Sequence, residues 1–391
     1  MTTGKYDIDS KDFDLEDCMA QAQQGNPDAQ VSIAYCYILG INGLEKDESK
    51  GFEWYRKSAE AGDEWGMALL GLCYEHGTGV GKDEAQAYEW YRKSAEAGDE
   101  VGMWLLGSCY EHGTGVAKDE AQAYEWYRKS AEAGDAYGMG LLGWCYWKGT
   151  GVEKDESQAY EWCRKSAEAG DTYGMALLGG CYEYGKGVEK DESQAYEWYR
   201  KSAEAGDGRG MALLGQCYAN GTGVEEDEAQ AFEWCQKSAE AGDAYGMALL
   251  GLCYEHGKGV EKDDAQAYEW YRKSAEAGDA AGMGLLGLCY EHGTGVGKDE
   301  KQAFVWYRKS AEAGDAYGMV LLGSCYAEGK GVEQDEAQVY EWCRKSAEAG
   351  DARGMVLLGL CYEHGTGVEQ DEAQAQYWKQ KAIEAGWEEE A

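Results

Sequence analysis

Residues 63–98 read DEWGMALLGLCYEHGTGVGKDEAQAYEWYRKSAEAG, and this 36-residue unit recurs along most of the chain. Its Gly66-Met67 pair returns every 36 residues as far as Gly354-Met355. A divergent first copy begins near Ala29 and has one extra residue in its turn, at residues 40–43. A fixed period of this length is typical of proteins built by stacking one supersecondary unit. The ten copies therefore override the two or three globular domains that 391 residues would otherwise suggest.

Each unit contains the signals of two helices. Asp63 follows a helix-ending glycine and can cap a helix over residues 64–75. Asp83, followed three residues later by Gln86, resembles a capping box and starts a second helix, which Gly98 ends. Two short antiparallel helices cannot bury both of their faces alone, so neighbouring units must stack. The sequence therefore predicts an all-α fold, a right-handed superhelical solenoid of helix hairpins.

The two ends of the array differ from its middle as capping units do. Residues 13–25 resemble a lone second helix that covers the first hairpin. In the last copy, Gln376 and Lys379 replace tyrosines that would face a further repeat. We therefore expect a flexible tail over residues 1–12, a capping helix over 13–27, ten repeats over 28–386 and an acidic tail over 387–391.

The composition narrows the partners that the chain can bind. With 36 lysines and arginines against 74 aspartates and glutamates, the formal net charge is -38. Such a chain repels phosphate backbones and acidic membrane surfaces, so we expect no direct binding of nucleic acid or membrane. A basic partner is compatible with the negative electrostatic field of the chain. The first residues lack the apolar stretch of a secretory signal, and no apolar run is long enough to span a bilayer. We expect a cytoplasmic protein, and the sequence leaves its oligomeric state open.

Ten of the 14 cysteines fall in one column of the repeat, from Cys36 and Cys73 to Cys361. Equivalent residues of stacked hairpins lie about 10 Å apart, since each helix layer takes about 8–10 Å. A disulfide needs Cα atoms closer than about 7 Å. The column is therefore interpreted as small buried thiols in a reducing compartment.

We find no constellation of residues that would support catalysis, a metal or a cofactor. The five histidines share one column and are separated by whole repeats, so no three of them could bind one metal ion. The chain has no phosphate-cradling glycine-rich motif ending in Gly-Lys-Ser/Thr, and no zinc-protease motif. Near-identical copies also spread the same groups along a rod instead of gathering distinct groups in a pocket. We expect a protein that is not an enzyme.

Residues 70–98 carry the pattern LGxxYxxGxGVxxDxxxAxxWYxKxAxxG, which resembles the Sel1-like repeat, a relative of the tetratricopeptide repeat, and nearly the whole chain follows it. The resemblance implies an α/α superhelix, a role as an adaptor for proteins or peptides and no catalytic residues. Cysteine-rich bacterial members carry disulfides near the end of the second helix and the start of the next repeat. Those regions hold Ala95 and Gly102 here, so that pairing is not carried over.

The copies differ from one another mainly in their first helix, at positions 65, 68, 72, 75 and 76 and their equivalents. At about 100° per residue these five positions fall within one arc about 100° wide. Because the first helices line the concave side of such solenoids, we expect the variable positions to form a groove. Four of the five tryptophans outside the second-helix column lie in this stripe.

Two interpretations of this stripe stay open. Exposed positions can drift freely, but drift favours polar residues, whereas tryptophan, tyrosine and arginine are typical of binding hot spots. The leading hypothesis is a groove that holds a protein or peptide, with its main contact in the first half of the chain. The alternative is an acidic decoy that captures a basic protein. The candidate groove residues are Trp65, Trp104, Tyr137, Trp144, Trp147, Tyr173, Tyr184, Arg209, Tyr245, Tyr317 and Arg353.

Overall fold

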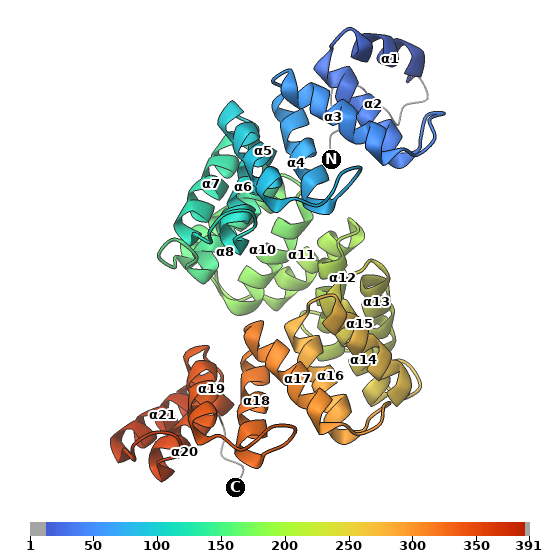
Figure 1. Cartoon of the computed structure of the whole chain (residues 1–391). Coiled ribbons are helices and arrows are strands. Elements are labelled where there is room, and N and C mark those ends of the chain that lie inside the picture. Colours follow the sequence, from blue (N-terminus) through green and yellow to red (C-terminus); the bar gives the residue numbers. More distant parts are fainter. Residues whose placement is uncertain (1–12, 388–391) are drawn as a thin grey trace. The chain divides into compact units, whose positions relative to one another are not determined.

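The computed structural model describes residues 13–387, and all regular secondary structure in that range is helical (Figure 1). The chain forms two compact units that divide between Asp191 and Glu192, and each unit is described by itself. The tail predicted over residues 1–12 lies outside the described residues, as do residues 388–391 of the predicted acidic tail. No helix in the described part of the chain is long and apolar enough to cross a membrane.

After α1 (Leu15–Gln23), two types of helix alternate, which we call helix A and helix B of each repeat. The helices A are α2 (Pro27–Leu39), α4 (Glu64–His76), α6 (Glu100–His112), α8 (Ala136–Lys148), α10 (Thr172–Tyr184), α12 (Gly208–Asn220), α14 (Ala244–His256), α16 (Ala280–His292), α18 (Ala316–Glu328) and α20 (Ala352–His364). The helices B are α3 (Glu48–Glu60), α5 (Glu84–Ala97), α7 (Glu120–Ala133), α9 (Glu156–Glu168), α11 (Glu192–Glu204), α13 (Glu228–Glu240), α15 (Asp264–Glu276), α17 (Glu300–Glu312), α19 (Glu336–Glu348) and α21 (Glu372–Glu384).

Aspartates begin the helices, as the sequence predicts. The carboxylate of Asp63 accepts a hydrogen bond from the Gly66 N–H at 2.7 Å, and that of Asp83 accepts one from the Gln86 N–H at 3.0 Å. Both bonds satisfy backbone donors that a helix start leaves unpaired. The reciprocal half of the predicted capping box is wrong, because the Asp83 N–H donates to the carbonyl oxygen of Tyr74 at 2.9 Å. That bond ties the start of helix B to the end of helix A.

Glycines end helix A and shape the turn that follows it. Gly77 has a φ of 76° at the end of α4, and Gly79 has a φ of 70°. A Cβ atom added at Gly79 would lie 2.1 Å from the carbonyl oxygen of Glu48, at the start of the preceding helix B. The Gly-Thr-Gly turn therefore rests directly on the neighbouring repeat, and only glycine fits there.

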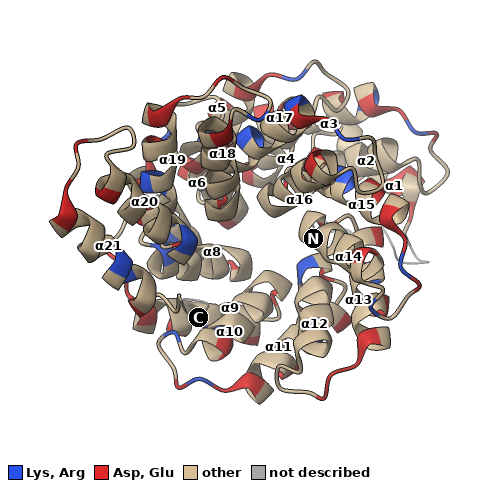
Figure 2. Ribbon diagram, turned by 90° about the horizontal axis from the view of Figure 1, so that it is seen from below, with Lys and Arg blue, Asp and Glu red and all other residues tan. Residues whose placement is uncertain are grey.

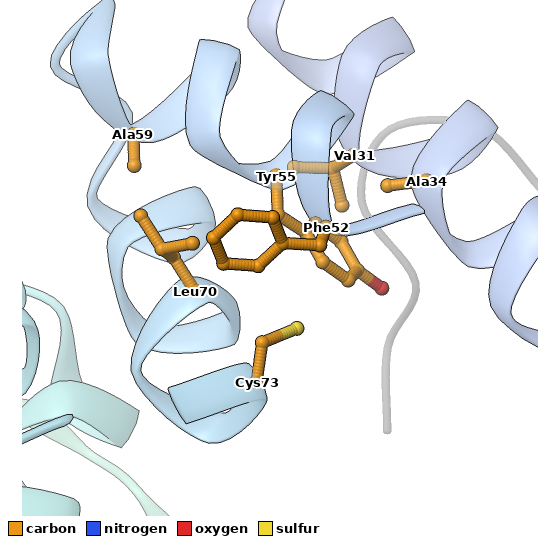
Figure 3. Packing of buried hydrophobic residues seen from close by; sticks show 7 residues of the cluster. All are labelled: Val31, Ala34, Phe52, Tyr55, Ala59, Leu70 and Cys73. Atoms are coloured by element: carbon orange, nitrogen blue, oxygen red, sulfur yellow. The ribbon is translucent and has the colours of Figure 1, made fainter. Parts of the chain in front are cut away.

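The hydrophobic core is shared between neighbouring repeats. Figure 3 shows one such cluster, whose members come from three successive helices. They are Val31 and Ala34 of α2, Phe52, Tyr55 and Ala59 of α3, and Leu70 and Cys73 of α4. Equivalent clusters recur in the later repeats. The all-α solenoid of stacked 36-residue hairpins is thereby confirmed, and the right-handed sense of its superhelix stays a prediction.

Contacts between repeats place helices A on the inner side of the curve within each unit. From α4 onward, each helix A contacts the helix A of the next repeat in its unit, in addition to the helices B beside it. No two successive helices B among the described elements make contacts of that extent. Layers that pack closely on one side and spread on the other must curve toward the close side.

The ends of the array are closed in different ways. At the start, α1 packs on α2, and Cys18 and Ala22 join Ala29 and Ile33 in one buried cluster. At the other end, the Lys379 amino group forms an ion pair with the Glu363 carboxylate at 2.6 Å.

Candidate functional site

Several candidate residues near the start of helices A contact a candidate residue of the next repeat. In the first unit, Trp104 of α6 meets Tyr137 of α8 edge to face, with ring centroids 5.0 Å apart. Tyr137 in turn contacts Tyr173 of α10 at 5.4 Å. Burial is the main cause that raises the pKa of Tyr173, so this end of the row belongs largely to the interior.

In the second unit, arginines take part in the same kind of contact. The Arg209 guanidinium lies 3.9 Å from the ring centroid of Tyr245, and that of Arg353 lies 5.0 Å from the ring centroid of Tyr317. The Tyr245 hydroxyl also donates to the Gln216 side-chain oxygen at 3.1 Å. Both arginines therefore make cation–π contacts across neighbouring helices A.

A second group of candidate residues lies at the C-terminal ends of α8 and α10. The ring centroids of Trp144 and Trp147 are 6.4 Å apart, and Trp147 meets Tyr184 edge to face, also at 6.4 Å. The Lys148 amino group lies 4.8 Å from the Trp144 ring centroid. Tyr184 is 61% exposed, while both tryptophans are half-buried. We call these four residues, Trp144, Trp147, Lys148 and Tyr184, the aromatic patch.

The prediction that all five variable positions line one open groove is wrong for position 68. Ala68 and its equivalents Ala176, Ala212 and Ala248 are buried. This position packs against the next repeat, where a side chain has little room. Trp104 occupies the same position in α6, and α6 and α8 contact each other less than any other successive helices A from α4 onward within a unit. Trp104 therefore acts as a spacer between the two helices.

Position 75 faces helix B and not only the groove. The hydroxyl of Tyr127 donates to the Glu111 carboxylate at 2.6 Å, and the same bond recurs from Tyr307 to Glu291 at 2.6 Å. The glutamate at this position thus accepts a hydrogen bond from a tyrosine of the helix B that follows it. The residue type at position 75 therefore depends on its contact with helix B. A helical wheel of helix A alone does not show this contact.

The two positions change together. In three repeats helix B has cysteine where the others have tyrosine, and in those repeats helix A has no glutamate at position 75. Cys163 is matched by Trp147, Cys235 by Ala219 and Cys343 by Ala327. In the last repeat Lys379 replaces the tyrosine and Glu363 remains, so an ion pair takes the place of the hydrogen bond. Glutamate therefore occurs at position 75 where helix B supplies a hydrogen-bond or ion-pair donor. A half-buried carboxylate without such a partner would destabilise the fold.

Two residues of the site were not predicted from the sequence. Lys148 belongs to the aromatic patch and is four residues after Trp144, a spacing that places two side chains on one helix face. Gln216 anchors Tyr245 from the preceding repeat, and no sequence signal marks it. Trp65 packs against two successive core clusters. Among the described residues, it forms no aromatic ring pair with another candidate.

The described residues contain no group of three or more histidine, cysteine, aspartate or glutamate side chains that could hold a metal ion. All five histidines are exposed at the ends of helices A. Aspartate and glutamate residues occur in the helices and the connecting loops of both units (Figure 2). Many of those on helix B are paired with arginine, as in the 2.6 Å contact between Arg92 and Glu89.

Comparison with known proteins identifies the repeats. A protective antigen of uropathogenic Escherichia coli with an SLR fold is 35% identical, over 96% of this chain and 90% of that chain, with a TM-score of 0.50. A Sel1 repeat protein from Oxalobacter formigenes is 31% identical, over 63% of this chain and 96% of that chain, with a TM-score of 0.53.

A curated relative matches a shorter segment. HRD3A of Arabidopsis thaliana, an ERAD-associated E3 ubiquitin-protein ligase component, is 36% identical over 69 residues, which is 18% of this chain. The match spans 10% of the length of the Arabidopsis protein. The Sel1 repeat model matches ten times, at residues 27–63, 66–99, 101–135, 136–171, 172–207, 208–243, 244–279, 280–315, 316–351 and 352–387. Because these matches cover nearly the whole chain, the chain belongs to the Sel1 repeat family.

Proposed function

We propose that this chain is a non-enzymatic scaffold that binds a protein or peptide on the inner face of helices A, with the aromatic patch of the first unit as the main contact. Sel1 repeat proteins are typically protein-interaction scaffolds. The observation that carries the proposal is the patch itself, where two tryptophans and a 61% exposed tyrosine gather on neighbouring helices. Clustered aromatic residues of this kind dominate the binding energy of protein interfaces.

The chemistry of the patch favours a basic side chain of the partner. α8 ends at Lys148 and α10 at Tyr184, so the negative ends of two helix dipoles point toward this region. The Lys148 ammonium already lies over the Trp144 ring, which indicates that a cation is accommodated there. The net charge of -38 would steer a basic partner toward the chain. We infer that a lysine or arginine of the partner stacks on these rings, with Lys148 displaced.

The test compares two variants of the full chain that carry alanine at equivalent positions of two different repeats. The first carries Trp144→Ala and Lys148→Ala. The control carries Leu252→Ala and His256→Ala, which are the equivalent positions of α14. Trp104 is left intact, because its removal would alter the spacing of α6 and α8. Partners captured from a native lysate by each protein are quantified by mass spectrometry at low and high salt, after circular dichroism has shown equal helicity.

We expect the first variant to lose a partner that the control keeps, at both salt concentrations. A partner lost equally by both variants would contradict the proposal.

The second candidate function is the acidic decoy, which the excess of 74 acidic over 36 basic residues favours. A decoy would keep its partner in both variants and release it at high salt, because exposed charges are screened.

A further inference from the structure

Four cysteines lie outside the conserved column, and each precedes a column cysteine by 18 residues. They are Cys18, Cys163, Cys235 and Cys343, and their partners at this spacing are Cys36, Cys181, Cys253 and Cys361. The last three of the four stand where helix B of the other repeats has tyrosine or, at the end, lysine. In those repeats the tyrosine ring packs near the column cysteine of the next helix A, as Tyr91 does with Cys109. Cysteine at the same place therefore brings two thiols together.

Two of these pairs each lie within one buried cluster of the core. Cys235 shares its cluster with Cys253, and Cys343 shares its cluster with Cys361. In the third pair, the neighbouring Cys181 thiol and burial raise the pKa of Cys163. All six side chains are buried. Each pair joins a helix B to the helix A of the next repeat within one unit, as in α9 and α10.

The surroundings of these cysteines differ from those of the tyrosines at the same position in other repeats. The glutamate that would accept a hydrogen bond from tyrosine is replaced in the same repeats by Trp147, Ala219 and Ala327. A Cβ atom added at Gly143 would lie 2.6 Å from the Cys163 sulfur, so helix A holds this thiol closely from the other side. The fourth pair differs, since the Cys18 thiol donates to the Ala29 carbonyl at 3.7 Å and the Asn42 amide donates to the Cys36 sulfur at 3.5 Å.

We propose that Cys163–Cys181, Cys235–Cys253 and Cys343–Cys361 are oxidation sites, each of which closes into a disulfide between neighbouring repeats. The helix pairs involved already lie in contact, and both cysteines of each pair are buried. This inference is independent of the aromatic patch and of any partner. For Cys181, Cys253 and Cys361, it goes beyond the interpretation of the column cysteines as small buried thiols.

The oxidant is a small-molecule disulfide such as oxidised glutathione. The thiolate of one cysteine attacks a sulfur of the oxidant, which forms a mixed disulfide and releases one thiolate. The second cysteine of the pair then loses its proton and attacks the protein sulfur of the mixed disulfide, which releases the second thiolate. The protein loses two electrons and two protons, and the oxidant becomes two reduced thiols.

Access of the oxidant to the core determines when a pair can react. Because both sulfurs are buried, the oxidant reaches them when neighbouring repeats separate locally, so we expect oxidation to accelerate in mild denaturant.

The chain contains its own controls. Cys73, Cys109, Cys145, Cys289 and Cys325 occupy the same column, but the residue 18 positions earlier is tyrosine in each case. These five cysteines are also buried, so they differ from the paired ones in having no second thiol opposite them. If burial alone determined oxidation, the paired cysteines and the five control cysteines would be oxidised to the same extent.

The experiment treats the full chain with oxidised glutathione at a urea concentration below the unfolding transition. Free thiols are then alkylated, and unreduced peptides are mapped by mass spectrometry. We expect three crosslinked peptides, one for each proposed pair, and alkylation of the five control cysteines. Alkylation of all six proposed cysteines, lasting mixed disulfides at these sites, or crosslinks that join them to other residues would each overturn the proposal.

A second measurement distinguishes disulfides that form in the folded arrangement from crosslinks that form at random in unfolded chains. The oxidised chain should unfold at a higher urea concentration than the reduced chain, and dithiothreitol should abolish the difference, because a crosslink restricts the unfolded chain. A variant with Cys163→Ser, Cys235→Ser and Cys343→Ser keeps a hydroxyl at each site and should show no gain after oxidation. An equal gain in that variant would contradict the assignment to these pairs.

Discussion

At the residue scale, the repeats show how one contact constrains two positions. From the second repeat onward, tyrosine on helix B is accompanied by glutamate on helix A, as in Tyr271 and Glu255, whose atoms lie 2.5 Å apart. Where cysteine replaces the tyrosine, the glutamate is absent as well. The joint change is visible in the sequence, but its reason is not, because the two positions lie 16 residues apart on different helices. Only the packing of helix A on helix B explains it.

This contact can be tested with a double-mutant cycle on Tyr271 and Glu255. Tyr271→Phe leaves a half-buried carboxylate without its donor, so we expect it to lower the free energy of unfolding by about 1–3 kcal/mol. Glu255→Ala should also destabilise, but the two changes together should cost less than their sum. Urea unfolding of the four proteins measures the coupling, and strict additivity would show that the hydrogen bond contributes nothing.

A second prediction at this scale concerns the buried cap Asp99. Burial raises the pKa of Asp99 to about 6, above its ordinary value of 3.8. Between these two pH values the folded chain keeps a proton that the unfolded chain has lost, so this group's contribution to stability falls as the pH rises from about 4 to about 6. Asp99→Asn keeps an acceptor for the Gly102 N–H and removes the titration.

The variant should therefore gain stability relative to the parent chain as the pH rises through this window, by about 2–3 kcal/mol at most. Urea unfolding at pH 4 and pH 7 gives the comparison. Asp83→Asn, at an exposed cap of helix B, controls for the loss of a carboxylate. An Asp99→Asn effect that is the same at both pH values would contradict the prediction.

At the scale of the elements, the ends of the helices follow directly from the sequence. Asp63 and Asp83 begin their helices where predicted, and Gly77 and Gly98 end theirs with positive φ. Capping is a local interaction between residues two to five apart, so a single sequence contains the necessary information. The face that each helix turns toward its neighbours depends on packing between repeats. That is why position 68 was assigned to the groove although Ala68 is buried.

The two glycines of one turn should respond differently to substitution. Gly77→Ala forces alanine into a left-handed conformation with ordinary contacts nearby, at a cost of about 1–2 kcal/mol. Gly79→Ala has the same conformational cost and also places a Cβ atom 2.1 Å from the Glu48 carbonyl oxygen. We expect it to destabilise the chain by at least twice as much in thermal unfolding. Equal losses would show that the turn can move away from the preceding repeat.

At the scale of the whole molecule, the repeat period determined the architecture before any helix was assigned. Ten matching units cover the chain, and their stacking follows from apolar faces that a single hairpin cannot bury. Trp144, Trp147 and Tyr184 were among the groove candidates named from the sequence, and the structure brings their rings together. The part played by Lys148 was not, because contacts between a charged side chain and a ring depend on orientation.

The charge of the chain leads to a prediction about salt. Each exposed arginine–glutamate pair contributes little, whereas a net charge of -38 opposes the compact state by self-repulsion. Screening should therefore stabilise the fold, so we expect the melting temperature to be several degrees higher in concentrated sodium chloride than in dilute buffer. A lower melting temperature in concentrated salt would show that the ion pairs outweigh the repulsion.

The extensive contacts of the described chain all join helices one or two places apart in sequence. A protein of this kind pulled at its two ends carries the tension through every repeat in series, and no distant contact shares the load. We expect it to lengthen in separate steps, each of which releases one repeat and roughly 120 Å of extended chain. The Sel1 array would then yield to force gradually and shorten again repeat by repeat when the force is removed.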